Sequence, residues 1–419
     1  MEAKDLTRER FRALAFTSLA HLLNDSFLVT MSVLIDFYLD MSVPALYLGV
    51  MAALVNVLSG LASPVISSLA DRRGWHNQLM LLGFSLIGTS SLLFAGAFIP
   101  VGVVRLALIG LGAVFLGLGL SFYHPLGGAI LQYAYEGNAG PALGINGAFG
   151  SIGRALFPLM MVLAIKALGG GAGLSLIAVY VYALASVIYL GLRPFHMPHT
   201  GETRSQSASR LLAYYNALAP LTLVVFIRAM FMSGAMTYFP TYVDSIVHSK
   251  VLMGVIVTAS YATAIVGQPF FGWLVGRIGG RNVIVITTIA STAFYIAFLL
   301  VRDLYLLTTL LAMYSFFAMS GFPVLLGYVS EVVGPEARAQ ANSLVWGVGN
   351  TVGGAVGIMV GGSLVSISRL TFMVTTTGLD AAMWSFAVFA LISMALLILI
   401  PEGRSSRKAL GHDKDVHLS

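Results

Sequence analysis

Apolar stretches long enough to cross a lipid bilayer recur along almost the whole chain. A bilayer core about 30 Å thick needs roughly 20 apolar residues in a helix. Inside it every backbone polar group needs a partner within the protein, so spanning segments must be helices or closed barrels. The short alternating segments of a β-barrel are not evident. We therefore predict twelve membrane-spanning helices, at about 13–39, 45–70, 78–99, 104–131, 141–166, 173–193, 215–240, 251–275, 282–301, 304–330, 341–366 and 379–401.

Composition indicates an exterior covered by lipid. Hydrophobic residues make up 58% of the 419 residues and charged residues only 10%, whereas soluble domains average about 25% charged residues. A water-soluble globule of this size would lack the polar side chains to coat its surface. The formal net charge of +6 is therefore interpreted as a bias of cytoplasmic loops and not as a nucleic-acid-binding surface. The absence of cysteine excludes disulfides and thiolate chemistry.

Lysine and arginine are distributed unevenly between the two sets of loops. If the N-terminus is inside, most of them fall on inner segments and few on outer ones. Because positive side chains are retained on the cytoplasmic side, we expect a multi-pass protein of the plasma membrane with both termini cytoplasmic. Residues 1–12 are polar and basic, so the first apolar stretch is interpreted as a retained span and not as a cleaved signal peptide.

The chain divides into two related halves. One long polar break, Arg193 to Arg210, carries proline, glycine and serine and is interpreted as a linker between two six-helix bundles. The predicted boundaries are 1–194 and 214–402 for the bundles, 195–213 for a cytoplasmic linker and 403–419 for a cytoplasmic tail. A shift of 205 residues aligns four pairs at the second span and its following loop: Gly49 with Gly254, Pro64 with Pro269, Arg72 with Arg277, and Gly74 with Gly279.

This organisation and its duplicated loop resemble the major facilitator superfamily. The signature of that family after the second span runs G-x-x-x-D-R-x-G-R-R, and Asp71, Arg72 and Gly74 match it. The second half keeps Arg277 but has Gly276 in place of the acid. The resemblance implies an all-α polytopic membrane protein of twelve transmembrane helices in two pseudo-symmetric six-helix bundles.

The same resemblance implies a cytoplasmic gate formed by Asp71, Arg72, Arg73, Gly74 and Arg277. A carboxylate that meets a helix end or an arginine of the opposite bundle would favour one of two conformations by about 1–3 kcal/mol where it is partly buried. Gly74 would permit the tight loop. The alternative is that Arg72 and Arg73 only keep this loop on the cytoplasmic side.

A narrower resemblance concerns the first half. His21, Asn24 and Asp25 form an H-x-x-N-D element in the first span, and Phe122-Tyr123-His124-Pro125 follows in the fourth. Both elements look like those of the fosmidomycin-resistance branch of the superfamily. Leu126 stands where that branch usually has glutamate, so the resemblance does not assign a substrate.

Three charged residues are predicted to lie near the bilayer midplane. At 1.5 Å per residue from the cytoplasmic end of each span, Asp25, Arg154 and Arg228 reach a similar depth, where such transporters bind substrate. Two arginines from opposite bundles would suit an anion, because guanidinium binds carboxylate or phosphonate in a bidentate manner. The alternatives are an Asp25–Arg154 ion pair and, for Arg228, a carbonyl partner or snorkelling.

His21 and Asp25 are four residues apart and share a helix face, with Asn24 beside it. This pair is a candidate for carrying a proton, and a structural polar cluster is the alternative. Tyr123 and His124 come directly before Pro125, which is expected to bend the fourth span so that both side chains face the cavity. The alternative for His124 is a packed histidine or an interhelical hydrogen bond.

Polar and small residues in other spans complete the set of candidates. Gln268 and Asn350 are possible substrate-binding groups of the second half, with interhelical hydrogen bonds as the alternative. Acids near outer span ends are expected to be solvated: Asp36, Asp40, Asp244 and Asp380. Glycines in the fifth and eleventh spans predict close helix packing: Gly144, Gly147, Gly150, Gly153, Gly347, Gly353, Gly357 and Gly361.

These observations predict a secondary active transporter that moves a small organic anion or drug-like solute by alternating access, with proton coupling as an option. A facilitator or uniporter of a neutral solute is the second hypothesis, and a non-transporting receptor or lipid-handling protein is the third. No Walker A or hydrolase motif is present, so neither ATP use nor an enzyme activity is expected. The expected partners are a small-molecule substrate, protons and lipids, with no nucleic acid, metal or cofactor, in a monomer.

Overall fold

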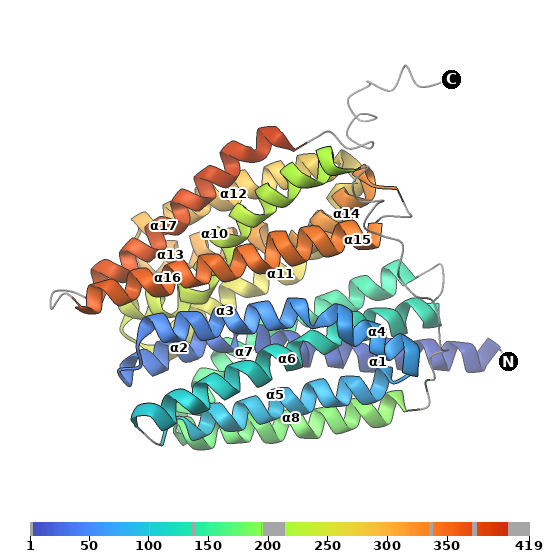
Figure 1. The fold of residues 1–419 in the computed structure, drawn as a ribbon, viewed down its shortest axis with the longest axis horizontal. Coiled ribbons are helices and arrows are strands. Elements are labelled where there is room, and N and C mark those ends of the chain that lie inside the picture. Colours follow the sequence, from blue (N-terminus) through green and yellow to red (C-terminus); the bar gives the residue numbers. More distant parts are fainter. Residues whose placement is uncertain are drawn as a thin grey trace. The chain divides into compact units, whose positions relative to one another are not determined.

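The computed structural model describes residues 3–99, 101–135, 139–193, 195, 214–319, 321–334, 338–370 and 375–400. Every regular element in this part of the chain is helical (Figure 1). Eleven segments are long and apolar enough to cross a membrane, and Leu304–Ala318 is a shorter apolar helix. These segments fall at the twelve predicted positions, which confirms the all-α, twelve-span expectation.

The six spans of the first half are built from eight α-helices. The first span contains a short 3-10 turn and the second is broken at Ala62, directly before Ser63 and Pro64. The elements are α1 (Ala3–Ser26), η1 (Phe27–Val29), α2 (Thr30–Asp40), α3 (Ala45–Leu61), α4 (Ser63–Arg73), α5 (His76–Gly96), α6 (Gly102–Tyr135), α7 (Ala139–Leu168) and α8 (Gly170–Leu192).

Two spans of the second half, the tenth and eleventh of the chain, are not uninterrupted α-helices. The tenth span is divided near Met319, and the eleventh contains a π-helical stretch. The elements are α10 (Tyr215–Val247), α11 (Lys250–Ile278), α12 (Gly280–Leu300), α13 (Leu304–Ala318), α14 (Gly321–Val332), α15 (Arg338–Leu344), η3 (Val345–Val352), α16 (Gly353–Leu370), α17 (Thr375–Ala395) and η4 (Leu396–Leu399).

The contacts divide the chain into two compact units. Unit 1 comprises Met1–Glu202 with Thr237–Thr258, and unit 2 comprises Thr203–Met236 with Ala259–Ser419. The C-terminal part of α10 and the N-terminal part of α11 therefore belong with the helices of the first half. The domain boundaries inferred from the sequence stay a prediction, since the linker (except Phe195) and the tail lie outside the described residues.

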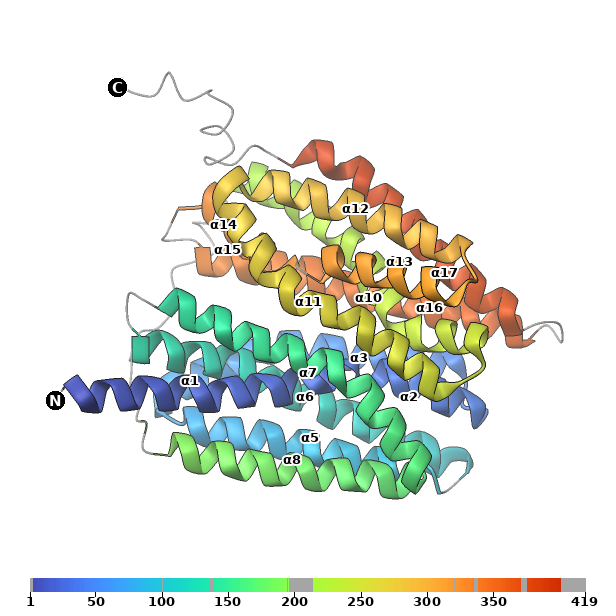
Figure 2. The same ribbon diagram turned by 180° about the vertical axis from the view of Figure 1, so that it is seen from behind.

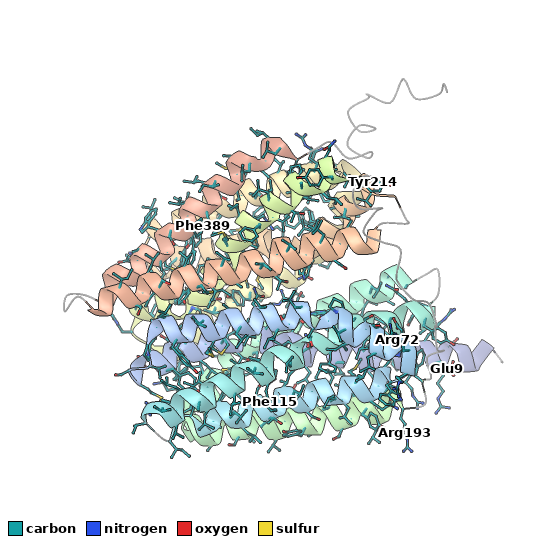
Figure 3. The ribbon with its side chains drawn as sticks, viewed as in Figure 1. Glu9, Arg72, Phe115, Arg193, Tyr214 and Phe389 are labelled. Carbon is teal, nitrogen blue, oxygen red and sulfur yellow. The ribbon has the colours of Figure 1, made fainter. Side chains whose placement is uncertain are left out.

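Basic residues gather at one end of unit 1. Figure 3 shows Arg72 and Arg193 at the end where the N-terminal part of α1, with Glu9, also lies. Arg72 follows the second span and Arg193 the sixth, so an even number of crossings separates each of them from the N-terminus. Their common position agrees with the alternation of inner and outer loops that the sequence predicts.

Helices α1 and α7 lie side by side in unit 1 (Figure 2). Their approach depends on positions without side chains, because a Cβ at Gly153 would overlap the carbonyl oxygen of Leu22. A Cβ at Gly150 would lie 2.5 Å from the ring of His21. Lipid tails are as apolar as the side chains they would replace, so such close packing is a principal source of helix association in a bilayer. The predicted packing is confirmed at these two glycines.

Glycine positions also let two helices approach closely in unit 2, where α16 packs against α10. A Cβ at Gly353 would overlap the carbonyl oxygen of Phe226, and one at Gly357 would overlap that of Met230. Gly144, Gly147 and Gly347, in contrast, have no heavy atom within 4 Å of an added Cβ, so the predicted close packing is not found there. In each unit, the first and fifth spans of that half of the chain therefore pack against each other at glycine positions.

We predict that Gly153→Leu destabilises the protein, because a side chain there would force α7 away from α1; overpacking of this kind costs about 1–3 kcal/mol. Thermal unfolding in detergent would show a lower midpoint. Gly144→Leu is the matched control, since an added Cβ at Gly144 meets nothing within 4 Å. Equal midpoints for the two variants would contradict the packing role of Gly153.

Candidate functional site

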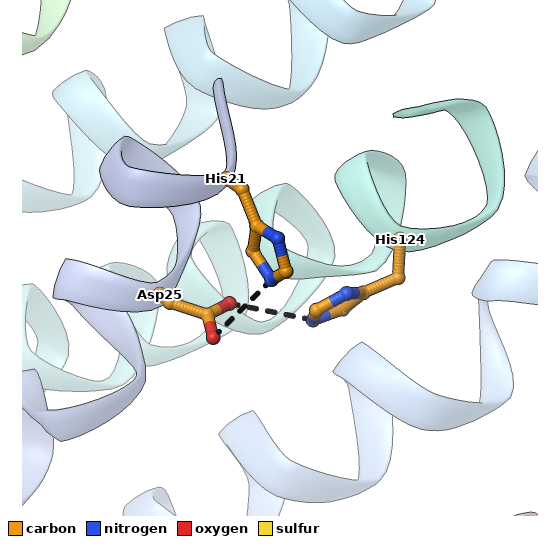
Figure 4. A group of neighbouring side chains, drawn as sticks. All are labelled: His21, Asp25 and His124. Carbon is orange, nitrogen blue, oxygen red and sulfur yellow. Dashed lines mark ion pairs between the residues drawn. The ribbon is translucent and has the colours of Figure 1, made fainter. Parts of the chain in front are cut away.

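Asp25 is the centre of a polar cluster inside unit 1 (Figure 4). Its side chain is 0% exposed, and each carboxylate oxygen has two partners. Oδ2 accepts a short charged hydrogen bond from Nη2 of Arg154 and lies 3.5 Å from Nε2 of His21. Oδ1 accepts a 3.1 Å hydrogen bond from Nδ2 of Asn24 and lies 3.5 Å from Nε2 of His124. Arg154 therefore supplies the compensating charge for this buried carboxylate, and Asn24 supplies a second hydrogen-bond donor.

Three helices supply these side chains, and the chain geometry explains why they meet. His21 and Asp25 lie one turn apart on α1, so they present the same face. His124 comes from α6 and Arg154 from α7. Gly150 lies one turn before Arg154 and leaves space that the His21 ring occupies. Gly150 therefore leaves room for the ring of His21 in the cluster and also allows α1 and α7 to pack closely.

A second layer of hydrogen bonds surrounds His21. Its Nδ1 lies 2.8 Å from Oδ1 of Asn146, a buried side chain of α7. The hydroxyl of Tyr123 lies 2.9 Å from the same oxygen, and Nδ2 of Asn146 donates to Oγ1 of Thr17 at 3.3 Å. The sequence analysis missed Asn146. The signal was its spacing, since Asn146 and Arg154 are eight residues apart on one face of a glycine-rich helix.

Exposure increases from the carboxylate outward. Asp25 is fully buried, the side chain of His21 is 14% exposed, and that of His124 is 49% exposed. The rings of the two histidines pack edge to face with centroids 5.3 Å apart. A more exposed imidazole thus lies beside a buried carboxylate, which is an arrangement suited to proton exchange.

Judged by distance alone, the Asp25 cluster could also bind a metal ion. The ligand atoms of His21, Asp25 and His124 lie within 4.8 Å of one another, and imidazole with carboxylate suits several transition metals. The guanidinium of Arg154, however, already compensates Asp25 and would repel a divalent cation beside it. The charge balance of the cluster therefore fits a proton better than a metal ion.

The structure brings together six of the residues singled out from the sequence. Asp25 contacts His21, Asn24, His124 and Arg154 directly. The ring of Tyr123 packs against that of His21 with centroids 4.7 Å apart, and its hydroxyl lies near Asn146. Of the two readings of Arg154, the structure shows the ion pair with Asp25.

Arg228 has a different environment in unit 2. It is 7% exposed, and its Nε and Nη2 have no hydrogen-bond partner. The residue lines a cavity of about 10 Å³ together with Thr287, Gly321 and aliphatic side chains, which is room for about one water molecule. In the described part of unit 2 no carboxylate forms an ion pair with it. Among the described residues of this unit, Arg228 is therefore a buried positive charge without a carboxylate partner.

The other two candidates of the second half lie at irregular helix positions. Nε2 of Gln268 donates to the carbonyl oxygen of Met319 at 3.3 Å, across the break between α13 and α14. This contact is the interhelical hydrogen bond that the sequence left as the alternative. Asn350 lies within the π-helical stretch Val345–Val352 and is half-buried.

The loop after the second span has the geometry expected for its glycine. Gly74 adopts a left-handed φ of 66°, and its N–H bonds to the carbonyl oxygen of Ala70 at 2.7 Å. Oδ1 of Asp71 lies 3.4 Å from Nε2 of His76, a partner that the sequence analysis did not identify. In the other unit, the guanidinium of Arg277 lies over the ring of Trp273. The role of Asp71, Arg72, Arg73 and Arg277 as a gate stays a prediction.

A second charged cluster was not foreseen. Nζ of Lys250 lies 2.7 Å from Asp36, 2.9 Å from Asp40 and 3.0 Å from Asp244, all within unit 1. The expectation that these acids are solvated is wrong for Asp36 and Asp244, whose side chains are 4% and 19% exposed, because α2, α10 and α11 meet around them. The side chain of Asp40 is exposed. The like-charged i,i+4 pair Asp36–Asp40 was a sequence signal for a nearby cation.

Bundled helices of membrane-spanning length, with charged side chains buried among them, are the architecture of a multi-pass membrane protein. The model of the Major Facilitator Superfamily matches residues 14–246 and 221–418, and the chain belongs to this superfamily. Two matches of this length fit two six-helix halves, and they identify a transporter rather than an enzyme.

Curated relatives extend the comparison. The chain is 25% identical over 368 residues to the fosmidomycin resistance protein of Escherichia coli (strain K12), covering 84% of this chain and 86% of that protein. It is 24% identical over 413 residues to YfnC of Bacillus subtilis (strain 168), named as an uncharacterised MFS-type transporter, covering 94% of each. The first relative confirms the resemblance to the fosmidomycin-resistance branch.

Solved structures share the fold. A mutant of the nucleoside transporter NupG has a TM-score of 0.75 at 16% identity, covering 94% of this chain and 100% of that chain. A bacterial homologue of the human lysosomal transporter Spinster, inward-facing and unoccupied, has a TM-score of 0.72 at 15% identity and covers 100% of both chains. At these identities the likeness shows the fold alone.

We predict that Lys250→Met strongly destabilises the protein, because it leaves the buried carboxylate of Asp36 without its cation. Removing one partner of a buried pair costs about 3–5 kcal/mol. The thermal unfolding midpoint should fall, and Lys250→Met with Asp36→Asn should recover part of the loss. Asp40→Asn is the control, since the Asp40 side chain is largely exposed and such pairs contribute about 0–1 kcal/mol. A Lys250→Met protein as stable as the parent would contradict this account.

Proposed function

We propose that this protein is a proton-coupled secondary transporter that moves a small organic anion across the plasma membrane by alternating access, with both termini cytoplasmic. The observation that carries the proposal is the Asp25 cluster, in which a buried carboxylate is held by an arginine and faced by two histidines. Ionisable groups inside spans are costly and mark substrate or proton pathways.

The cluster supports coupling through its charge balance. With neutral imidazoles, Asp25 and Arg154 sum to zero charge. One added proton gives the cluster a net charge of about +1, and it weakens the hold of the carboxylate on Arg154. The guanidinium then becomes available to an anion. A proton and an anion therefore bind together, and either one increases the affinity for the other.

Arg228 supports an anionic substrate from the second unit. A buried guanidinium without a carboxylate partner is costly, and it becomes favourable when an anion fills its free edge. Nε and Nη2, the two atoms without partners, are adjacent donors of the planar fork. This arrangement matches the two oxygens of a carboxylate or phosphonate.

A drug-like solute is compatible with this proposal through one relative. The name of the Escherichia coli protein links that protein to resistance to fosmidomycin. For this chain, efflux and uptake are distinguished by the direction of the pH gradient that drives solute movement in vesicles.

The central test is transport in proteoliposomes. We expect a pH gradient to drive accumulation of the solute, and Asp25→Asn to abolish this response while solute exchange at equal pH persists. Asparagine is neutral, so it removes the charge that holds Arg154 and that faces His21. Thermal unfolding of Asp25→Asn, alone and with Arg154→Gln, separates misfolding from loss of coupling. Uptake that ignores the gradient in both the parent and Asp25→Asn would favour a facilitator of a neutral solute.

A ligand screen tests the role of Arg228. We expect anionic compounds, and not neutral or cationic analogues, to raise the thermal unfolding midpoint of the purified protein. Arg228→Gln should lose this stabilisation, whereas Arg302→Gln should retain it, because Arg302 bonds carbonyl oxygens at the end of α12. Stabilisation of Arg228→Gln by the same anions would contradict the proposed contact. A protein that no solute stabilises but that moves lipid between vesicle leaflets would favour a lipid-handling function.

A further inference from the structure

Thr17 determines how the side-chain amide of Asn146 is oriented. Oγ1 of Thr17 lies 2.7 Å from the carbonyl oxygen of Ala13, one turn earlier on α1. A carbonyl oxygen only accepts hydrogen bonds, so the Thr17 hydroxyl donates its hydrogen there. Toward Asn146 the hydroxyl therefore presents a lone pair.

The amide must consequently turn its NH₂ group to Thr17. Nδ2 of Asn146 donates to Oγ1 of Thr17 at 3.3 Å, and Oδ1 faces the other way. There it lies 2.8 Å from Nδ1 of His21 and 2.9 Å from the hydroxyl of Tyr123. The opposite orientation would set the amide oxygen against a hydroxyl oxygen whose hydrogen is already used.

The orientation of the amide fixes the tautomer of His21. An amide oxygen accepts, so Nδ1 of His21 must carry hydrogen. A neutral imidazole has one N–H, which leaves Nε2 with a lone pair. That atom lies 3.5 Å from Oδ2 of Asp25. Two lone pairs would then face each other, and one added proton converts the contact into a charge-assisted hydrogen bond.

The remaining charged and titratable neighbours do not supply that proton to Nε2. Arg154 donates to Oδ2 of Asp25, and Asn24 donates to Oδ1. His124 faces Oδ1, the opposite oxygen. The hydroxyl of Tyr123 points to Oδ1 of Asn146 and to the carbonyl oxygen of Thr17.

We propose that Asn146 is a positioning residue that holds His21 as the Nδ1–H tautomer, so that Nε2, facing Asp25, is the atom that receives the coupled proton. This inference rests on the proposed proton coupling. One N–H bond forms at Nε2 when a proton is taken from solution, and the same bond breaks when the proton is released. Asn146 touches neither proton nor substrate, and acts only through the imidazole.

Nitrogen-15 NMR of the full-length protein, labelled at histidine and held in lipid nanodiscs, tests the tautomer directly. The His21 signals are identified by their loss in His21→Gln. In the neutral form we expect a protonated Nδ1 and a bare Nε2. Asn146→Leu and Thr17→Val should both lose this tautomer preference, whereas Thr17→Ser, which keeps the hydroxyl, should retain it. An Nε2–H tautomer in the parent protein, or an unchanged one in both disruptive variants, would overturn the proposal.

A transport measurement tests the consequence. Asn146→Leu and Thr17→Val remove the hydrogen bonds that orient the imidazole of His21. We therefore expect the pH dependence of transport to shift in both variants and to be unchanged in Thr17→Ser. Thr17→Val leaves Asn146 in place, so it covers the case in which Asn146→Leu fails to fold.

The outcomes separate this inference from the proposed function. If transport by the parent protein does not depend on pH, the proposed proton coupling is wrong, whatever the NMR spectrum shows. A pH-dependent parent whose profile is unchanged in Thr17→Val and Asn146→Leu would defeat the role of Asn146 alone. Histidine signals that change on EDTA treatment and return with Zn²⁺ would show that the cluster holds a metal ion, which would also overturn the proposal.

Discussion

The ion pair between Asp25 and Arg154 is the interaction on which the interior of unit 1 depends. Either charge alone would carry a large desolvation cost inside a membrane span, so neither residue can be explained without the other. The pair forms because Gly150 and Gly153 let α7 approach α1 without intervening side chains. His21 fills the space left at Gly150, and so the packing of two helices and the composition of the polar cluster have the same cause.

The two halves share this packing but not its chemistry. Gly353 and Gly357 bring α16 against α10 as Gly150 and Gly153 bring α7 against α1. In the second half, however, no described acid accompanies the buried Arg228. The duplicated scaffold therefore preserves the contact between the first and fifth spans of each half, while compensated charge belongs to one unit and uncompensated charge to the other. The internal repeat in the sequence therefore indicates the helix packing that the two halves share, but not the difference in their buried charges.

Much of this arrangement could be predicted from the sequence because lipid imposes strong constraints. Span length and charge depth are linear properties of the chain, and they placed Asp25 and Arg154 at a common level. Asn146 and Lys250 escaped prediction, since their importance comes from which helices become neighbours. The acids near Lys250 seemed solvated because position near a span end says nothing about the helices that cover it. The break near Met319 also lay beyond the apolar pattern, which continues through it.

The π-helical stretch Val345–Val352 has a consequence for the helix that contains it. Hydrogen bonds there run from residue i to i+5, one residue further than in an α-helix. Conversion of such a turn to α-helical bonding would rotate the preceding segment by roughly 100°, the rotation of one residue. Gly353 and Gly357, beyond the stretch, pack against α10, while Ala341 in α15 and Val345 at the start of the stretch are buried in the core of unit 2. The eleventh span therefore changes helical register at this stretch while the segments on both sides of it stay packed within unit 2.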